Sequence, residues 1–172
     1  TCMTRLVDET LVDQFGLQKG FGDPAVTTLD PACGTGTFPL AVTDRAADRM
    51  REERGAAGPA QAATTLGNTL FGFELLPGPY AVAHLRITER LRELGGQLPA
   101  NGVNVLLTDT LASPNDDTGP QLTLFGDAAV LAAERPDVVH VQHLLGVPAA
   151  IGAALRGAGG PHVPALPHYW LG

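Results

Sequence analysis

The chain has 172 residues, and its 44% of apolar residues is ordinary for a globular protein with a buried core. Eighteen acidic and eleven basic side chains give a formal net charge of −7, which would repel the phosphates of DNA rather than attract them. Two cysteines exclude a disulfide framework, and no apolar run reaches the roughly 18 residues that cross a bilayer.

Residues 1–11 lack the basic-then-apolar layout of a secretory signal, and the chain begins at Thr1 instead of an initiator Met. We therefore expect a cytoplasmic protein without membrane contact, and we expect this sequence to be part of a larger polypeptide. Metal binding is not expected. The histidines at 140 and 143 would point to opposite faces of a strand, and no cysteine accompanies them.

Helical and strand patterns alternate along the first two thirds of the chain. Apolar spacing predicts a helix over 6–15 that Gly16 stops, followed by a buried strand over 26–29. A second helix is predicted over 38–54, and the Ala/Gly-rich stretch 55–65 is interpreted as a mobile surface connection. A strand over 70–74, a helix over 79–94 and a strand over 103–107 complete a partial α/β, Rossmann-like fold with a parallel central sheet.

The most informative segment lies between the first strand and the second helix, where the sequence reads Asp-Pro-Ala-Cys-Gly-Thr-Gly-Thr-Phe from Asp30 to Phe38. Gly34 and Gly36 allow a sharp turn and close approach of the backbone to a ligand, because neither carries a Cβ. The helix that follows would direct its free N–H groups into the same space. A Gly-x-Gly turn also serves packing alone, but a P-loop is disfavoured because no Gly-Lys-Ser/Thr ending is present.

Two further acids follow strands and would meet Asp30 at the carboxyl edge of a parallel sheet. Glu74 ends the second strand, where an acid accepts hydrogen bonds from ribose hydroxyls, although it could instead cap the next helix. Asp109 follows the third strand and could accept a hydrogen bond from an adenine amino group, or simply form a turn. Such a group of carboxylates would suit a ligand that carries hydroxyls, an amino group and a positive charge.

From residue 6 to about 127 the chain resembles the methyltransferase region of single-polypeptide type I restriction-modification enzymes. The segments Val7-Asp8-Glu9, 29–38, Phe71-Gly72-Phe73-Glu74, Pro79-Tyr80 and 103–111 carry the resemblance, in this order. It implies an S-adenosylmethionine-dependent methyltransferase fold, with Asp30, Gly34 and Gly36 around the methionine part of the cofactor. The predicted cofactor-binding residues are Asp30, Pro31, Ala32, Cys33, Gly34, Gly36, Phe38, Glu74, Leu75, Asp109 and Thr110.

The family's catalytic motif, Asn/Asp-Pro-Pro-Tyr/Phe, is missing from this sequence, so no catalytic residue is assigned and the chain alone is expected to be inactive. Residues 128–172 form a divergent tail with a predicted strand over 138–142 and a βαβ-like pattern. Its segments 136–141 and 168–171 resemble the amino-terminal domain of nucleotide-sugar glycosyltransferases. We interpret residues 1–127 as a partial cofactor-binding domain joined to this tail.

The resemblance implies a function in DNA modification. The chain would bind S-adenosylmethionine within a site-specific DNA adenine methyltransferase of a restriction-modification system, which transfers a methyl group to the exocyclic amine of adenine. DNA would be bound by regions outside this chain, in the rest of a larger restriction-modification polypeptide. Two alternatives stay open: a nucleotide-sugar glycosyltransferase fragment, and a non-catalytic nucleoside-binding module.

Overall fold

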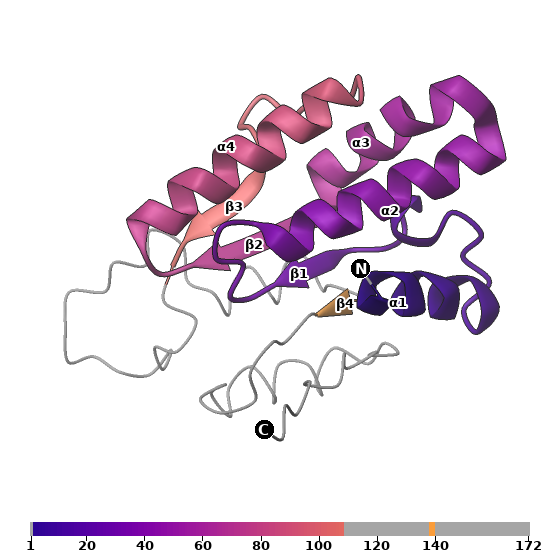
Figure 1. Cartoon of the computed structure of the whole chain (residues 1–172), viewed down its shortest axis with the longest axis horizontal. Helices are drawn as coiled ribbons and strands as arrows, with labels where there is room; N and C mark the ends of the chain where they lie inside the picture. The colour runs from indigo at the N-terminus through magenta and orange to yellow at the C-terminus, as the bar shows by residue number, and fades with distance from the viewer. Residues whose placement is uncertain (1, 109–137, 140–172) are drawn as a thin grey trace.

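The computed structural model of the chain describes residues 2–108 and the backbone of residues 138–139 (Figure 1). None of the described helices is both long and apolar enough to cross a membrane. The elements in chain order are α1 (Cys2–Asp13), the short 3-10 helix η1 (Gly20–Gly22), β1 (Thr28–Asp30), α2 (Thr37–Arg54), the short 3-10 helix η2 (Gly55–Ala57), α3 (Gly58–Thr69), β2 (Leu70–Glu74), α4 (Pro77–Glu93), β3 (Asn104–Leu107) and β4 (Val138–Val139).

The strands form one parallel sheet in the order β3-β2-β1-β4. Helices α2 and α3 connect β1 to β2, and α4 connects β2 to β3; Figure 1 shows all three helices on the same side of the sheet. The order is compatible with part of a doubly wound nucleotide-binding fold, in which ligands lie at the carboxyl ends of the strands. The expected α/β architecture with a parallel central sheet is confirmed.

Strand β4 lies beside β1, with Val138 opposite Thr28 and Val139 opposite Leu29. The direction of the strand order therefore reverses at β1, because β2 lies on its other side. The first two residues of the strand predicted over 138–142 thus belong to the same sheet as β1, the strand that leads into the predicted cofactor loop. The rest of the predicted tail, including its glycosyltransferase-like segments, lies outside the described residues, and the boundary near residue 127 stays a prediction.

The core lies between the sheet and the three covering helices. All three residues of β1 are buried, as are the first four of β2, which is typical of strands in parallel sheets. Met50 from α2, Leu66 from α3 and Leu91 from α4 are buried in one core with Leu70 of β2. Phe73 of β2 is also fully buried. This packing fixes the carboxyl edges of β1 and β2, where the candidate site lies.

The prediction of a mobile connection over 55–65 is wrong, because the structure has η2 and most of helix α3 there. The small residues permit close packing rather than flexibility. Ala62 and Ala63 are fully buried, and a Cβ on Gly58 would collide with the backbone carbonyl of Met50 on α2. A stretch rich in glycine and alanine therefore forms a tightly packed helix, because its composition lets two helix backbones approach one another.

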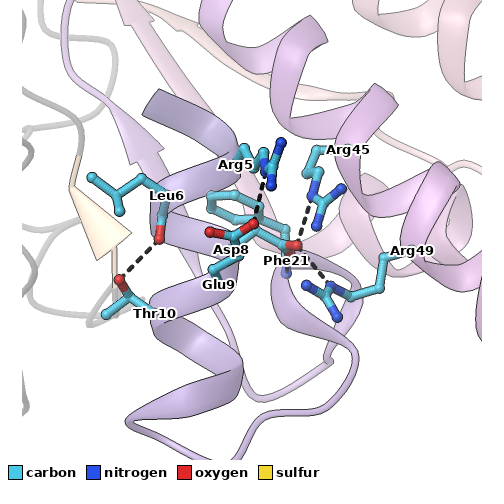
Figure 2. A network of polar contacts seen from close by, with 8 residues as sticks. All are labelled: Arg5, Leu6, Asp8, Glu9, Thr10, Phe21, Arg45 and Arg49. Atoms are coloured by element: carbon cyan, nitrogen blue, oxygen red, sulfur yellow. Dashed lines mark hydrogen bonds and ion pairs between the residues drawn. The ribbon is translucent and has the colours of Figure 1, made fainter. Parts of the chain in front are cut away.

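The carboxylate of Asp8 connects helix α1 to α2 and η1 (Figure 2), and it is completely buried. Its Oδ2 atom accepts hydrogen bonds from Nε of Arg45 and Nε of Arg49, each at 2.7 Å, and both arginines come from α2. Oδ1 accepts the backbone N–H of Phe21 in η1 at 3.2 Å. One carboxylate thus joins three elements, and the two cations compensate for its burial.

We predict that Asp8→Asn lowers the free energy of unfolding by about 2–4 kcal/mol, because it removes a buried charge that two arginines require. Urea denaturation would measure the change. The matched control is Glu9→Gln, which removes an exposed ion pair with Arg5 on the same helix and should leave stability almost unchanged. Equal losses in the two variants would contradict the central role of Asp8.

Candidate cofactor-binding site

Residues 31–36 form a tight loop between β1 and α2. The N–H of Cys33 donates to the carbonyl of Phe73 in β2 at 2.9 Å, and the N–H of Gly36 donates back to the carbonyl of Cys33 at 2.9 Å. Gly34 and Gly36 have φ angles of 56° and 82°, in the left-handed region that favours glycine. The predicted glycine-dependent turn is therefore present, and it directly precedes the first turn of α2.

The two glycines serve different physical purposes. A Cβ on Gly36 would lie 3.3 Å from the Cα of Ala83 and 3.3 Å from Cδ1 of Ile87, so the turn is packed tightly against α4. A Cβ on Gly34 would meet no described atom within 4 Å. Gly36 is therefore needed for close approach to a helix, whereas Gly34 faces open space and could lie against a ligand.

We predict that Gly36→Ala destabilises the protein more than Gly34→Ala. Both substitutions place alanine at a positive φ, which costs about 1 kcal/mol, but only the first also pushes against α4. We expect a total loss of about 2–3 kcal/mol at position 36. Thermal or urea unfolding of the two variants measures the difference, and a larger loss at position 34 would show that the packing of Gly36 is not limiting.

Asp30 ends β1 with its side chain fully buried. Its Oδ1 accepts the N–H of Ala32 at 3.2 Å, while Oδ2 has no hydrogen-bond partner among the described residues. Burial raises the pKa of Asp30 from 3.8 to about 7, and the nearby charge of Glu74 adds to the rise. A buried acid with one unused oxygen at the carboxyl edge of a parallel sheet is typical of a functional position.

The raised pKa of Asp30 predicts a pH dependence of stability. The folded protein holds this proton between about pH 4 and pH 7 whereas the unfolded chain releases it. The contribution of Asp30 to stability is therefore most favourable below pH 4, falls between pH 4 and 7, and levels off above pH 7. Above pH 7 we expect Asp30→Asn to exceed the wild type by roughly 2–4 kcal/mol in its free energy of unfolding, since one pKa unit corresponds to ~1.4 kcal/mol.

Unfolding curves at several pH values would measure this effect, and Asp30→Asn should remove most of the decline between pH 4 and 7. The control is Asp44→Asn, which removes an exposed carboxylate on α2 and should keep the decline. An Asp30→Asn variant with the same pH profile as the wild type would contradict the assignment.

Glu74 ends β2, and its carboxylate connects two loops. Oε2 accepts the N–H of Gly34 at 2.9 Å, and Oε1 accepts the N–H of Leu76, the residue that precedes α4, at 2.8 Å. The alternative that Glu74 caps the next helix finds a counterpart in the bond to Leu76, whereas ribose binding stays a prediction. Each carboxylate oxygen has further lone pairs, so these bonds leave acceptor capacity for a ligand hydroxyl.

The remaining predicted site residues have mixed exposure. Burial raises the pKa of the Cys33 thiol to about 12, so this cysteine stays protonated and packs against Gly72 instead of reacting. Leu75, directly after Glu74, is 53% exposed and so is available to a ligand. Pro31 and Phe38 are buried and Ala32 is exposed, whereas Asp109 and Thr110 lie outside the described residues.

Two residues that contribute to this site were not predicted. Gly72 lies in β2 directly under Cys33, where a Cβ would come within 3.1 Å of the sulfur; a glycine inside a strand is the sequence signal for such close approach. Arg86 on α4 donates from Nη1 to the carbonyl of Thr35 in the loop at 2.8 Å. No local pattern indicates that contact, because 51 positions separate the two residues.

Comparison with solved structures finds the same fold within much larger proteins. The ATP-dependent Type ISP restriction-modification enzyme LlaBIII, bound to DNA, matches 78% of this chain with a TM-score of 0.58 and 24% identity. The chain shares its fold with part of a restriction-modification enzyme. The protein in the cryoEM structure of a DrdV–DNA complex matches 80% of the chain with a TM-score of 0.56 and 26% identity.

This chain spans 9% of the length of LlaBIII and 12% of the DrdV chain. No family model and no curated protein matches the sequence. Within residues 2–108, no group of three or more His, Cys, Asp or Glu side chains is placed to hold a metal ion.

Proposed function

We propose that this chain is the S-adenosylmethionine-binding part of a DNA adenine methyltransferase in a restriction-modification system. The main support is the placement of Asp30, Glu74 and the Gly34–Gly36 turn at one edge of a parallel sheet. The fold match to LlaBIII, itself a DNA-bound restriction-modification enzyme, agrees with this proposal.

The described residues fit the chemical groups of this cofactor. The unused Oδ2 of Asp30 is an acceptor for an ammonium group and a favourable neighbour for a cation, and a bound cation would stabilise the ionised form of Asp30. Glu74 has acceptor capacity for ribose hydroxyls. The amino end of α2, where Gly36 offers no capping side chain, favours a carboxylate. The open space beside Gly34 would let a ligand lie against the loop.

The bound cofactor would supply an electrophilic methyl group on its sulfonium. In this chain Asp30 and Glu74 would bind and orient that molecule, and the exposed Leu75 would offer it an apolar contact. The same edge repels phosphates because two carboxylates lie there, which disfavours a nucleotide-sugar ligand and the glycosyltransferase reading. In the proposed assembly, other regions of a longer polypeptide would bind DNA and supply the adenine-binding motif that this sequence lacks.

A non-catalytic nucleoside-binding module is the second candidate, and the missing Asn/Asp-Pro-Pro-Tyr/Phe motif favours it. Transfer of a tritiated methyl group to DNA separates the two candidates. The longer polypeptide should methylate adenine if our proposal is correct. Binding of S-adenosylmethionine without methyl transfer by that polypeptide would favour the module.

We predict that the protein binds S-adenosylmethionine and that Glu74→Ala weakens binding at least tenfold, because hydrogen bonds to a carboxylate contribute about 1.5–3 kcal/mol each. Isothermal titration calorimetry would measure both affinities, with UDP-glucose as the competing ligand class. The control is Glu89→Ala, which removes an exposed acid on α4, away from Glu74 in sequence; it should bind like the wild type.

Glu74→Gln adds a further control, because its amide oxygen still accepts one backbone N–H and so supports the loop that Glu74→Ala releases. We expect its affinity to lie between those of the wild type and Glu74→Ala. Binding of UDP-glucose in preference to S-adenosylmethionine by the wild type would overturn the proposal.

A further inference from the structure

Helix α4 supports the loop with three neighbouring side chains. Ala83 and Ile87 lie against Gly36, and between them in sequence Arg86 donates from Nη1 to the carbonyl oxygen of Thr35. Residues separated by three or four positions share one face of a helix, so one face of α4 holds two successive residues of the loop.

The contact of Arg86 differs from those of the other paired arginines. Arg5, Arg45, Arg49, Arg51, Arg54 and Arg90 each pair with a carboxylate. Arg86 forms no ion pair with any described residue, and it donates instead to a backbone carbonyl 51 positions away. A hydrogen bond from a charged donor is stronger than one between neutral groups, so this contact restrains the loop despite its exposure.

The restraint acts on a peptide unit that could otherwise turn over. The Thr35 carbonyl and the Gly36 N–H belong to one planar peptide group. Glycine adopts either sign of φ, so the sequence itself permits that plane to rotate by half a turn at Gly36. Arg86 holds the carbonyl end of the plane, and the carbonyl of Cys33 holds its N–H end at 2.9 Å.

We propose that Arg86 is a positioning residue for the methionine part of the cofactor. By fixing the Thr35–Gly36 peptide it holds the turn beside Gly34, and with it the amino end of α2, in the arrangement that receives the ligand. The inference rests on the proposed binding of S-adenosylmethionine. In this role Arg86 contacts the loop and does not contact the ligand.

The alternative is that the other N–H groups of Arg86 bind the carboxylate of the cofactor directly. Decarboxylated S-adenosylmethionine separates these roles, because it keeps the sulfonium and the amino group and lacks only the carboxylate. A positioning residue affects both ligands, whereas a direct carboxylate contact affects only S-adenosylmethionine.

We predict that Arg86→Met weakens binding of both ligands about fivefold, because it keeps an unbranched apolar stem and removes the charged donor. Arg86→Lys retains a charged donor and should restore affinity to within about twofold of the wild type. The matched control is Arg92→Met on the same helix, since Arg92 is exposed and has no recorded contact with the loop. Calorimetry with the wild type and the three variants gives these values.

A second measurement needs no ligand. Amide hydrogen exchange at Gly36 should be faster in Arg86→Met than in the wild type, while the unfolding midpoint stays close to that of Arg92→Met. Faster exchange that Arg86→Lys reverses supports positioning.

Two results would overturn the inference while leaving the proposed function intact. One is unchanged affinity in Arg86→Met, and the other is a loss confined to S-adenosylmethionine. A wild-type protein that binds neither ligand would overturn both the inference and the proposed function.

Discussion

The candidate site depends on the close approach of one backbone turn to one helix. Gly36 lies against Ala83 of α4 because it has no Cβ, and this contact brings the start of α2 to the edge of the sheet where Asp30 and Glu74 end their strands. Glu74 and Arg86 then bind the same turn, Glu74 through the N–H of Gly34 and Arg86 through the carbonyl of Thr35. Protein groups alone therefore restrain this turn.

Two acids at this edge have different surroundings and therefore different chemistry. Glu74 accepts two backbone N–H groups, whereas Asp30 accepts one and leaves an oxygen without a described partner in a buried position. Burial keeps the pKa of Asp30 near neutrality, so a cationic ligand would favour loss of its proton on binding. A buried acceptor without a described partner carries a local cost in stability.

Asp8 shows what a buried acid looks like when its role is structural. It is as completely buried as Asp30, yet two arginines and a backbone N–H meet its oxygens, so α1, α2 and η1 are joined by one satisfied network. Asp8 and Asp30 therefore differ in their hydrogen-bond partners and not in their exposure. Asp30 has spare acceptor capacity toward the edge where the strand order reverses, which is where doubly wound folds bind ligands.

The sequence by itself determined the elements that build the site. Strand 70–74 agrees with β2, the helix predicted over 38–54 agrees with α2 to within one residue, and the Gly34–Gly36 turn lies between β1 and α2 as predicted. These features depend on local rules: runs of buried apolar residues, helical spacing, and glycine where φ is positive. The role of the site in binding S-adenosylmethionine stays a proposal, which comes from the family resemblance and which the geometry supports.

Tertiary structure alone decided the rest, because those features depend on contacts between distant segments. The Ala/Gly-rich stretch 55–65 predicted a connection, yet packing against α2 makes it part of a helix whose small residues allow two backbones to meet. The bonds from Gly34 to Glu74 and from Arg86 to Thr35 span 40 and 51 positions. No periodicity or spacing encodes such pairs; they form only when the parallel sheet and α4 bring the residues together.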